Sequence, residues 1–180
     1  ESWHKSDLGT NSFGQGISIT PIQMLRAVSA IANEGEMVIP RIVHGIVEDG
    51  EYYEAPVISA GHPISPETAQ TLSSMLAQSI KGESYQAALV PGYKLAGKTG
   101  TAEIYVQGEG YTSDLTDASF IGWGPVDDPR FMVYVWIHKP LKSPWGSTIA
   151  SPIFRHVVER VVIRLDIPPD GLRHSLQEDI

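Results

Sequence analysis

The strongest constraint on the fold is an apolar helical face near the end of the chain. Residues 149–165 place large apolar side chains at helical spacing, on one broad face: Ile153, Phe154, Val157, Val158, Val161, Val162 and Leu165. Such a helix is stable only when another element covers that face. The chain must therefore supply a layer of secondary structure on which this helix packs.

Three segments before the helix are predicted to form that layer. Residues 118–123 and 131–138 are apolar runs typical of strands, and residues 93–105 read as a strand interrupted by small residues. Residues 124–129 have the composition of a turn, and residues 108–113 read as a turn-rich excursion. Strands with short connections form an antiparallel meander. We therefore predict an α+β fold, an antiparallel sheet flanked by helices.

Two more helices are predicted from their capping signals. Thr20 and Ser65 each precede a proline, which is the arrangement of an N-cap and a first helical position. Gly35 and Gly82 are the expected stops. The expected apolar face of the second helix is Leu72, Met75, Leu76, Ser79 and Ile80.

The connecting segments are predicted from their composition. Asp49-Gly50 indicates a hairpin turn, and residues 9–20, rich in Gly, Ser and Thr, are predicted to form a loop. Residues 1–167 are assigned to one unit, and residues 168–180 to a polar, mobile C-terminal tail.

Composition excludes several classes of function. With 42% hydrophobic residues, the 180-residue chain can fill a core, and its net charge of −8 disfavours a general nucleic-acid binder. The chain has no cysteine and its six histidines are scattered singly, so neither a metal site nor a cofactor is expected. The start at Glu1 looks like a cut inside a longer protein, with any targeting segment upstream.

One short motif allows two functional interpretations. Residues 92–99 match the nucleotide-binding pattern G-x-x-x-x-G-K-[ST], but that pattern must run directly into a helix that holds the phosphate. Here Gly100, Thr101 and a β-branched cluster follow, which favours a strand. A P-loop nucleotide binder therefore remains only the minor alternative.

The second interpretation is the K-T-G element of serine acyltransferases that react with penicillin. On a strand, Lys98 and Gly100 would lie on one face, and Thr99 and Thr101 on the other. Lys98 offers a cation, and the threonines offer hydroxyl groups, for a substrate carboxylate. Gly100 leaves room for an acyl chain, and a backbone N–H could stabilise an oxyanion.

The surroundings of this element make the second interpretation specific. The segments that carry the signal are SFGQG at 12–16, TPIQ at 20–23, AIAN at 30–33, VPGY at 90–93, AGKTGTA at 96–102 and ASFIG at 118–122. In combination and order they resemble class B penicillin-binding proteins, over roughly residues 9–165. The chain looks like the C-terminal part of their transpeptidase domain.

The resemblance implies a function and a setting for the parent protein. Such proteins are D,D-transpeptidases anchored in the cytoplasmic (inner) membrane, and they cross-link peptidoglycan outside it, in cell division or cell shape. Lys98, Thr99, Gly100 and Thr101 would bind the stem peptide or a β-lactam, with the Thr101 amide as half of the oxyanion hole. The expected partners are the upstream part of the same domain and a glycosyltransferase, but no nucleic acid.

The sequence departs from the family pattern in two places. The S-x-N motif is absent, because neither Asn11 nor Asn33 has a serine two places before it. The S-x-x-K string at Ser2 to Lys5 stands at the very start of the chain, whereas the family's nucleophile opens a buried helix far upstream. We therefore expect no catalytic residue in this chain and no turnover by the chain alone. A non-catalytic scaffold or pseudo-enzyme with the same fold is the alternative.

Overall fold

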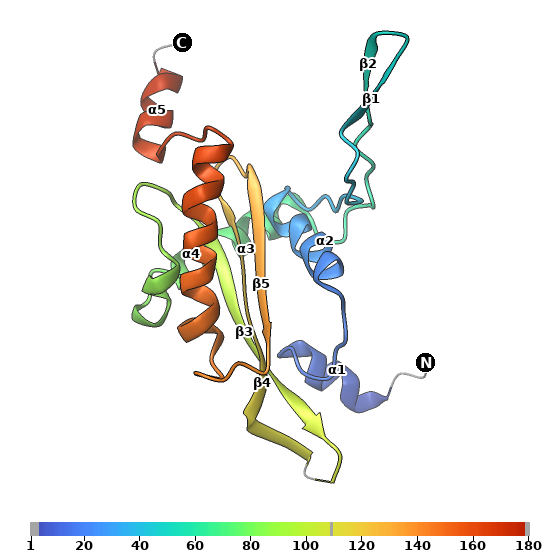
Figure 1. Ribbon diagram of the computed structural model, residues 1–180, viewed down its shortest axis with the longest axis vertical. Helices are drawn as coiled ribbons and strands as arrows, with labels where there is room; N and C mark the ends of the chain where they lie inside the picture. The colour runs from blue at the N-terminus through green and yellow to red at the C-terminus, as the bar shows by residue number, and fades with distance from the viewer. Residues whose placement is uncertain (1–3, 109, 179–180) are drawn as a thin grey trace.

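The computed structural model describes residues 4–108 and 110–178. A three-stranded sheet lies at its centre, with one layer of helices on each face (Figure 1). In chain order the elements are α1 (Lys5–Ser12), α2 (Pro21–Ala32), β1 (Gly45–Glu48), β2 (Glu51–Glu54), α3 (Pro66–Ser79), a 3₁₀ helix η1 (Glu83–Ala88), β3 (Ala96–Val106), β4 (Gly110–Gly124), β5 (Phe131–His138), α4 (Gly146–Arg164) and α5 (Asp170–Glu178).

The predicted antiparallel meander is confirmed. The sheet order is β3-β4-β5, with Thr99 opposite Phe120 and Phe120 opposite Val135. The predicted excursion is wrong for residues 110–113, because β4 already begins at Gly110 and pairs with β3 beyond a register shift after Glu103. That part of the hairpin depends on pairing across the strands rather than on local turn composition.

Helix α4 packs on one face of the sheet, as its apolar face predicts. Phe154, Val158 and Val162 are buried, and the ring centroids of Phe154 and Phe120 lie 4.5 Å apart. The predicted face is only half covered, however, since Ile153 remains 44% exposed and Val157 is also exposed. The helix begins at Gly146, three residues before the predicted start.

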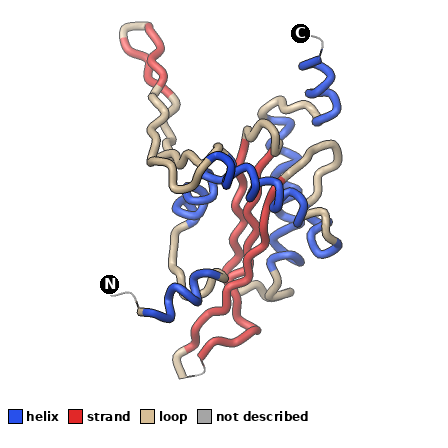
Figure 2. The backbone as a smooth tube through the Cα atoms, turned by 180° about the vertical axis from the view of Figure 1, so that it is seen from behind, coloured by secondary structure: helices blue, strands red, loops and turns tan. Residues whose placement is uncertain are grey.

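Helices α2 and α3 cover the opposite face (Figure 2). The buried residues of α3 are Ala69, Ser73 and Ala77, and Ala77 packs with Ala96 and Trp123 of the sheet. The predicted apolar face was wrong at Met75, which is 62% exposed, because small residues bring this helix close to the sheet and leave Met75 outside the contact.

The predicted N-caps and the hairpin turn are confirmed, whereas the C-caps of α2 and α3 are Asn33 and Ile80 rather than Gly35 and Gly82. Thr20 and Gln23 form a reciprocal capping box, and Ser65 Oγ accepts a hydrogen bond from the Thr68 N–H at 3.2 Å. Asp49 and Gly50 have φ values of 52° and 84°, the positive pair that a two-residue hairpin turn requires.

The predicted loop 9–20 is wrong in its first four residues, which belong to α1. Asp7 accepts a hydrogen bond from the His4 backbone N–H at 2.8 Å and so caps the helix. Ser12 Oγ donates to the Gly9 carbonyl at 2.7 Å, so a residue typical of loops satisfies a helical carbonyl instead.

The prediction of a mobile C-terminal tail is wrong for residues 170–178. They form α5, which is held by the segment before β3 and by the β4–β5 loop. Asp170 accepts from the Lys94 backbone N–H at 2.6 Å, and its own N–H donates to the Gly92 carbonyl at 2.8 Å. Arg173 binds Asp127 at 2.7 Å. The division of the chain between residues 167 and 168 stays a prediction.

The aromatic contact between α4 and the sheet gives a first test. Phe154→Ala is expected to lower the free energy of unfolding by about 3–5 kcal/mol, because it leaves a cavity against Phe120. The control Ile153→Ala, on the half-covered side of α4, should cost less than about 1 kcal/mol. Equal losses in urea unfolding would contradict the assignment of the buried face.

The anchor of α5 predicts a dependence on pH. The hydrogen bond from Arg173 holds the pKa of Asp127 well below its usual range, and His174 adds to this effect. The stabilisation is therefore present above the ordinary aspartate pKa of about 4 and is lost as the pH falls below that value. Asp127→Asn should cost about 0.5–1 kcal/mol at pH 6, and this cost should begin to fall as the pH drops below about 4. Urea unfolding from pH 6 to pH 3 measures this difference, with Asp114→Asn as the unpaired, exposed control.

Candidate functional site

The K-T-G-T residues lie on β3, at the outer edge of the sheet. β3 pairs with β4 on one side and with no other described strand on the other. Residues 96 and 97 are buried, whereas Lys98 is exposed and residues 99–101 are half-buried. The strand therefore becomes accessible to solvent at Lys98, where the predicted K-T-G element begins.

The two faces of β3 divide these residues as predicted. Lys98 lies opposite Ile121, and Gly100 lies opposite Ser119. Thr99 lies opposite Phe120, whose ring packs against α4, so Thr99 and Thr101 belong to the α4 face. A ligand along this edge would meet the cation and the hydroxyl groups from two sides of one strand.

Gly100 lies directly beside the Ser119 side chain of the neighbouring strand β4. A Cβ at Gly100 would lie 2.5 Å from Ser119 Oγ, so only glycine fits there without a shift of Ser119. Burial raises the pKa of Tyr134, while its hydrogen bond with Ser119 acts in the opposite direction. Tyr134 lies on β5 opposite Ile121, so strand register brings its hydroxyl group to Ser119.

The first residue of α4 holds Thr101. The Gly146 N–H donates to Thr101 Oγ1 at 3.2 Å, and a Cβ at Gly146 would lie 2.4 Å from the carbonyl oxygens of both Gly100 and Ser119. The Thr101 hydroxyl accepts this bond and keeps its own proton free to donate. Gly146 was missed from the sequence, where the only signal is a glycine just before a helix.

Lys98 is a cation without a carboxylate partner among the described residues. Its Nζ donates to the Thr99 carbonyl at 3.1 Å, and none of the ion pairs in the described part of the chain involves it. An exposed ammonium group on an open strand edge suits a carboxylate ligand, for which it can supply charge-assisted hydrogen bonds.

The structure contradicts the P-loop alternative. Strand β3 continues from Ala96 to Val106, so no helix follows Thr99 to hold a phosphate at its N-terminus. The letter match at residues 92–99 is therefore accidental.

The other polar and aromatic side chains around β3 differ in their surroundings. Asp117 binds His138 at 2.7 Å, and Glu103 is exposed and lies opposite Thr116, so the two carboxylates are not a catalytic pair. Trp123 is buried in the core, and Trp145 is exposed in the loop before α4. Ser2, the serine of the S-x-x-K string, lies outside the described residues.

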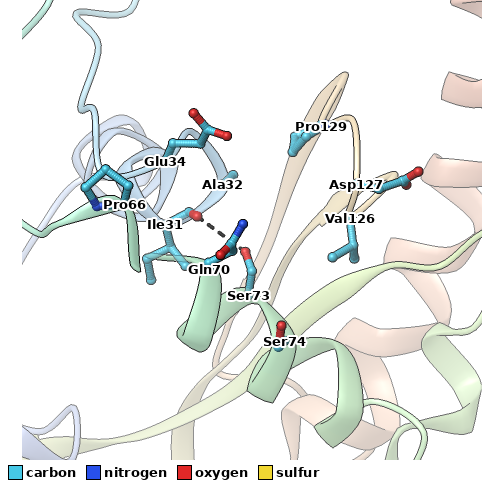
Figure 3. A pocket seen from close by; sticks show the side chains of 10 residues that line it. All are labelled: Ile31, Ala32, Glu34, Pro66, Gln70, Ser73, Ser74, Val126, Asp127 and Pro129. Atoms are coloured by element: carbon cyan, nitrogen blue, oxygen red, sulfur yellow. Dashed lines mark hydrogen bonds between the residues drawn. The ribbon is translucent and has the colours of Figure 1, made fainter. Parts of the chain in front are cut away.

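A cavity of about 250 Å³ lies away from this site, between α2, α3 and the β4–β5 loop. Ser73 Oγ donates to the Ile31 carbonyl at its wall, and Asp127 points away toward its own partners (Figure 3). None of its lining residues belongs to β3, so it is not part of the K-T-G site. No group of three or more His, Asp or Glu in the described ranges could hold a metal ion, and no described helix is long and apolar enough to cross a membrane.

Comparison with known proteins identifies the family. Residues 1–159 match the penicillin binding protein transpeptidase domain. The chain is 34% identical to the penicillin-binding protein PbpB of Mycolicibacterium smegmatis and 34% identical to the stage V sporulation protein D of Bacillus subtilis. These alignments cover 93% and 89% of the chain. The chain therefore belongs to the penicillin-binding transpeptidase family, as the sequence resemblance predicted.

Solved structures confirm the fold. The apo form of penicillin binding protein 3 from Mycobacterium tuberculosis superposes with a TM-score of 0.79 at 33% identity, over 93% of this chain and 40% of that one. The same protein complexed with ampicillin gives a TM-score of 0.77. The chain spans only 28% of the PbpB relative and 25% of the sporulation relative.

The contact between Gly146 and Thr101 gives a test of the site's geometry. Gly146→Ala is expected to cost about 1–3 kcal/mol and to shift the NMR signals of Gly100 and Thr101, because the new Cβ meets two backbone carbonyls. Gly171→Ala, where a Cβ meets nothing within 4 Å, should leave stability and those signals unchanged. Normal Thr101 signals in the Gly146 variant would show that α4 does not hold this strand.

Proposed function

We propose that this chain forms the K-T-G wall of the substrate site in a peptidoglycan D,D-transpeptidase. The single observation that carries the proposal is Lys98, an exposed cation without an ion-pair partner among the described residues, on the open edge of a family-specific strand. The β-lactam complexes of the related M. tuberculosis protein support penicillin or the stem peptide as the ligand.

Each residue of the wall has a chemical role in this proposal. Lys98 and the hydroxyl groups of Thr99 and Thr101 bind the carboxylate of the stem peptide or drug through charge-assisted hydrogen bonds. Gly100 lets the acyl chain approach the strand, and the Thr101 N–H stabilises the developing oxyanion. Gly146 keeps Thr101 in place.

The nucleophile belongs, in this proposal, to an upstream part of the same catalytic domain. Acyl transfer needs a serine and its base together, and the chain has no S-x-N motif. The exposed apolar side of α4, where Ile153 lines a hollow together with Leu141, supports an upstream segment as its cover.

We propose a setting for the parent from the family to which the chain belongs. We place the parent in the cell membrane with this domain on the extracytoplasmic side, where it joins stem peptides of peptidoglycan, and we expect a glycosyltransferase to work with it. The names of the relatives support a role in peptidoglycan synthesis or cell division. The scaffold alternative, a fold kept for partner contacts without turnover, separates from the enzyme by its lack of acylation.

Labelling with a fluorescent penicillin tests the proposal. The full-length parent should label, and Lys98→Ala should label about tenfold to a hundredfold more slowly, because a charge-assisted contact to the drug carboxylate is lost. The control Lys94→Ala removes an exposed lysine four residues away, outside the motif, and should label normally.

Two results would contradict the proposal. A parent that never labels is a scaffold rather than an enzyme. Labelling of the isolated 180-residue chain would mean that its own Ser2, not an upstream serine, is the nucleophile.

A further inference from the structure

The hairpin of β1 and β2 projects away from the body of the molecule (Figures 1 and 2). Its cross-strand pairs are Ile46 with Tyr53 and Val47 with Tyr52, and these four side chains are 50–71% exposed. Two strands alone are marginally stable in water, and large apolar side chains gathered on such an arm are typical of an interaction site.

One edge of this hairpin is open for another strand. The Ala55 N–H donates to the His44 carbonyl at 2.8 Å, so the alternation of antiparallel pairs turns the N–H and C=O groups of Gly45 and Val47 outward. On the opposite edge Pro56 follows β2 and offers no N–H group. The edge of β1 is therefore the better template for strand addition.

The charge of the hairpin limits the partner. Glu48, Asp49, Glu51 and Glu54 lie within residues 45–54, which contain no Lys or Arg, whereas the whole chain has a net charge of only −8. Glu54 pairs with Arg41, but none of the ion pairs among the described residues involves the three carboxylates nearest the tip. A second copy of the hairpin, or an anionic lipid surface, would bring like charges together.

We infer that the β1 edge binds an extended segment of another polypeptide in which apolar residues alternate with Lys or Arg. The segment adds as a third antiparallel or parallel strand, through the outward backbone groups of Gly45 and Val47. Its apolar side chains extend the face of Val47 and Tyr52, and its cations extend the opposite face, where Glu48 and Glu51 lie.

Hydrogen exchange of the full-length parent with two synthetic peptides tests this inference. One peptide alternates Val with Lys and the other alternates Val with Glu, at equal length. The Val/Lys peptide should slow exchange at Gly45 and Val47, bind at least about tenfold more tightly than the Val/Glu peptide, and weaken as salt rises. The double variant Glu48→Lys/Glu51→Lys should reverse this preference, and Val47→Pro should weaken binding of both peptides.

Penicillin labelling of each variant supplies the control for folding, since the hairpin is not part of the K-T-G wall and labelling should match that of the unchanged parent. Four results would overturn the inference: no protection by the Val/Lys peptide, equal affinity for both peptides, protection already present in the parent without peptide, or protection that appears only with phosphatidylglycerol vesicles. Protection that rises with protein concentration alone would instead assign the edge to a second copy.

Discussion

The structure depends on one close approach, between the first residue of α4 and the backbones of strands β3 and β4. Gly146 lies so near the carbonyls of Gly100 and Ser119 that a Cβ would be 2.4 Å from each. Two turns further along α4, Phe154 fills the core against Phe120. Because the same rigid helix makes both contacts, a shift of the core would also move the K-T-G strand. Packing and the geometry of the candidate site are therefore set by the same helix position.

The parts of the fold that the sequence predicted correctly have local causes. Thr20 caps α2 through a reciprocal capping box with Gln23, three residues away. Asp49-Gly50 adopts the two positive φ values that its turn requires. The strand at the K-T-G residues was predicted for the same reason, because Gly100 and the β-branched cluster after it disfavour a helix; its function was recognised only together with the more distant motifs. Such signals are complete within a few residues of the chain.

The parts that could not be predicted depend on distant partners. Helix α5 reads as a polar tail until Asp127 and the Lys94 N–H supply the groups that hold it. Periodicity places Ile153 on the apolar face of α4, but only the position of the sheet decides that Phe154 is buried and Ile153 is not. At the site, Gly146 and Ser119 come to Gly100 through loop closure and strand register, which a single sequence does not encode locally.

An unpaired strand edge is costly unless something binds it, because its backbone groups invite uncontrolled pairing. Among the described strands, β3 has such an edge, where Lys98 adds a positive charge, and the β1–β2 hairpin has another, with four carboxylates in its ten residues; β5 and β2 form the opposite edges of the two sheets. Opposite charge at these two edges agrees with a different proposed ligand for each: a carboxylate-bearing peptide or drug at β3, and a basic segment at β1. The same charge that attracts the proper ligand at one edge repels the ligand of the other, so two open edges can coexist in one domain without competing for the same strand.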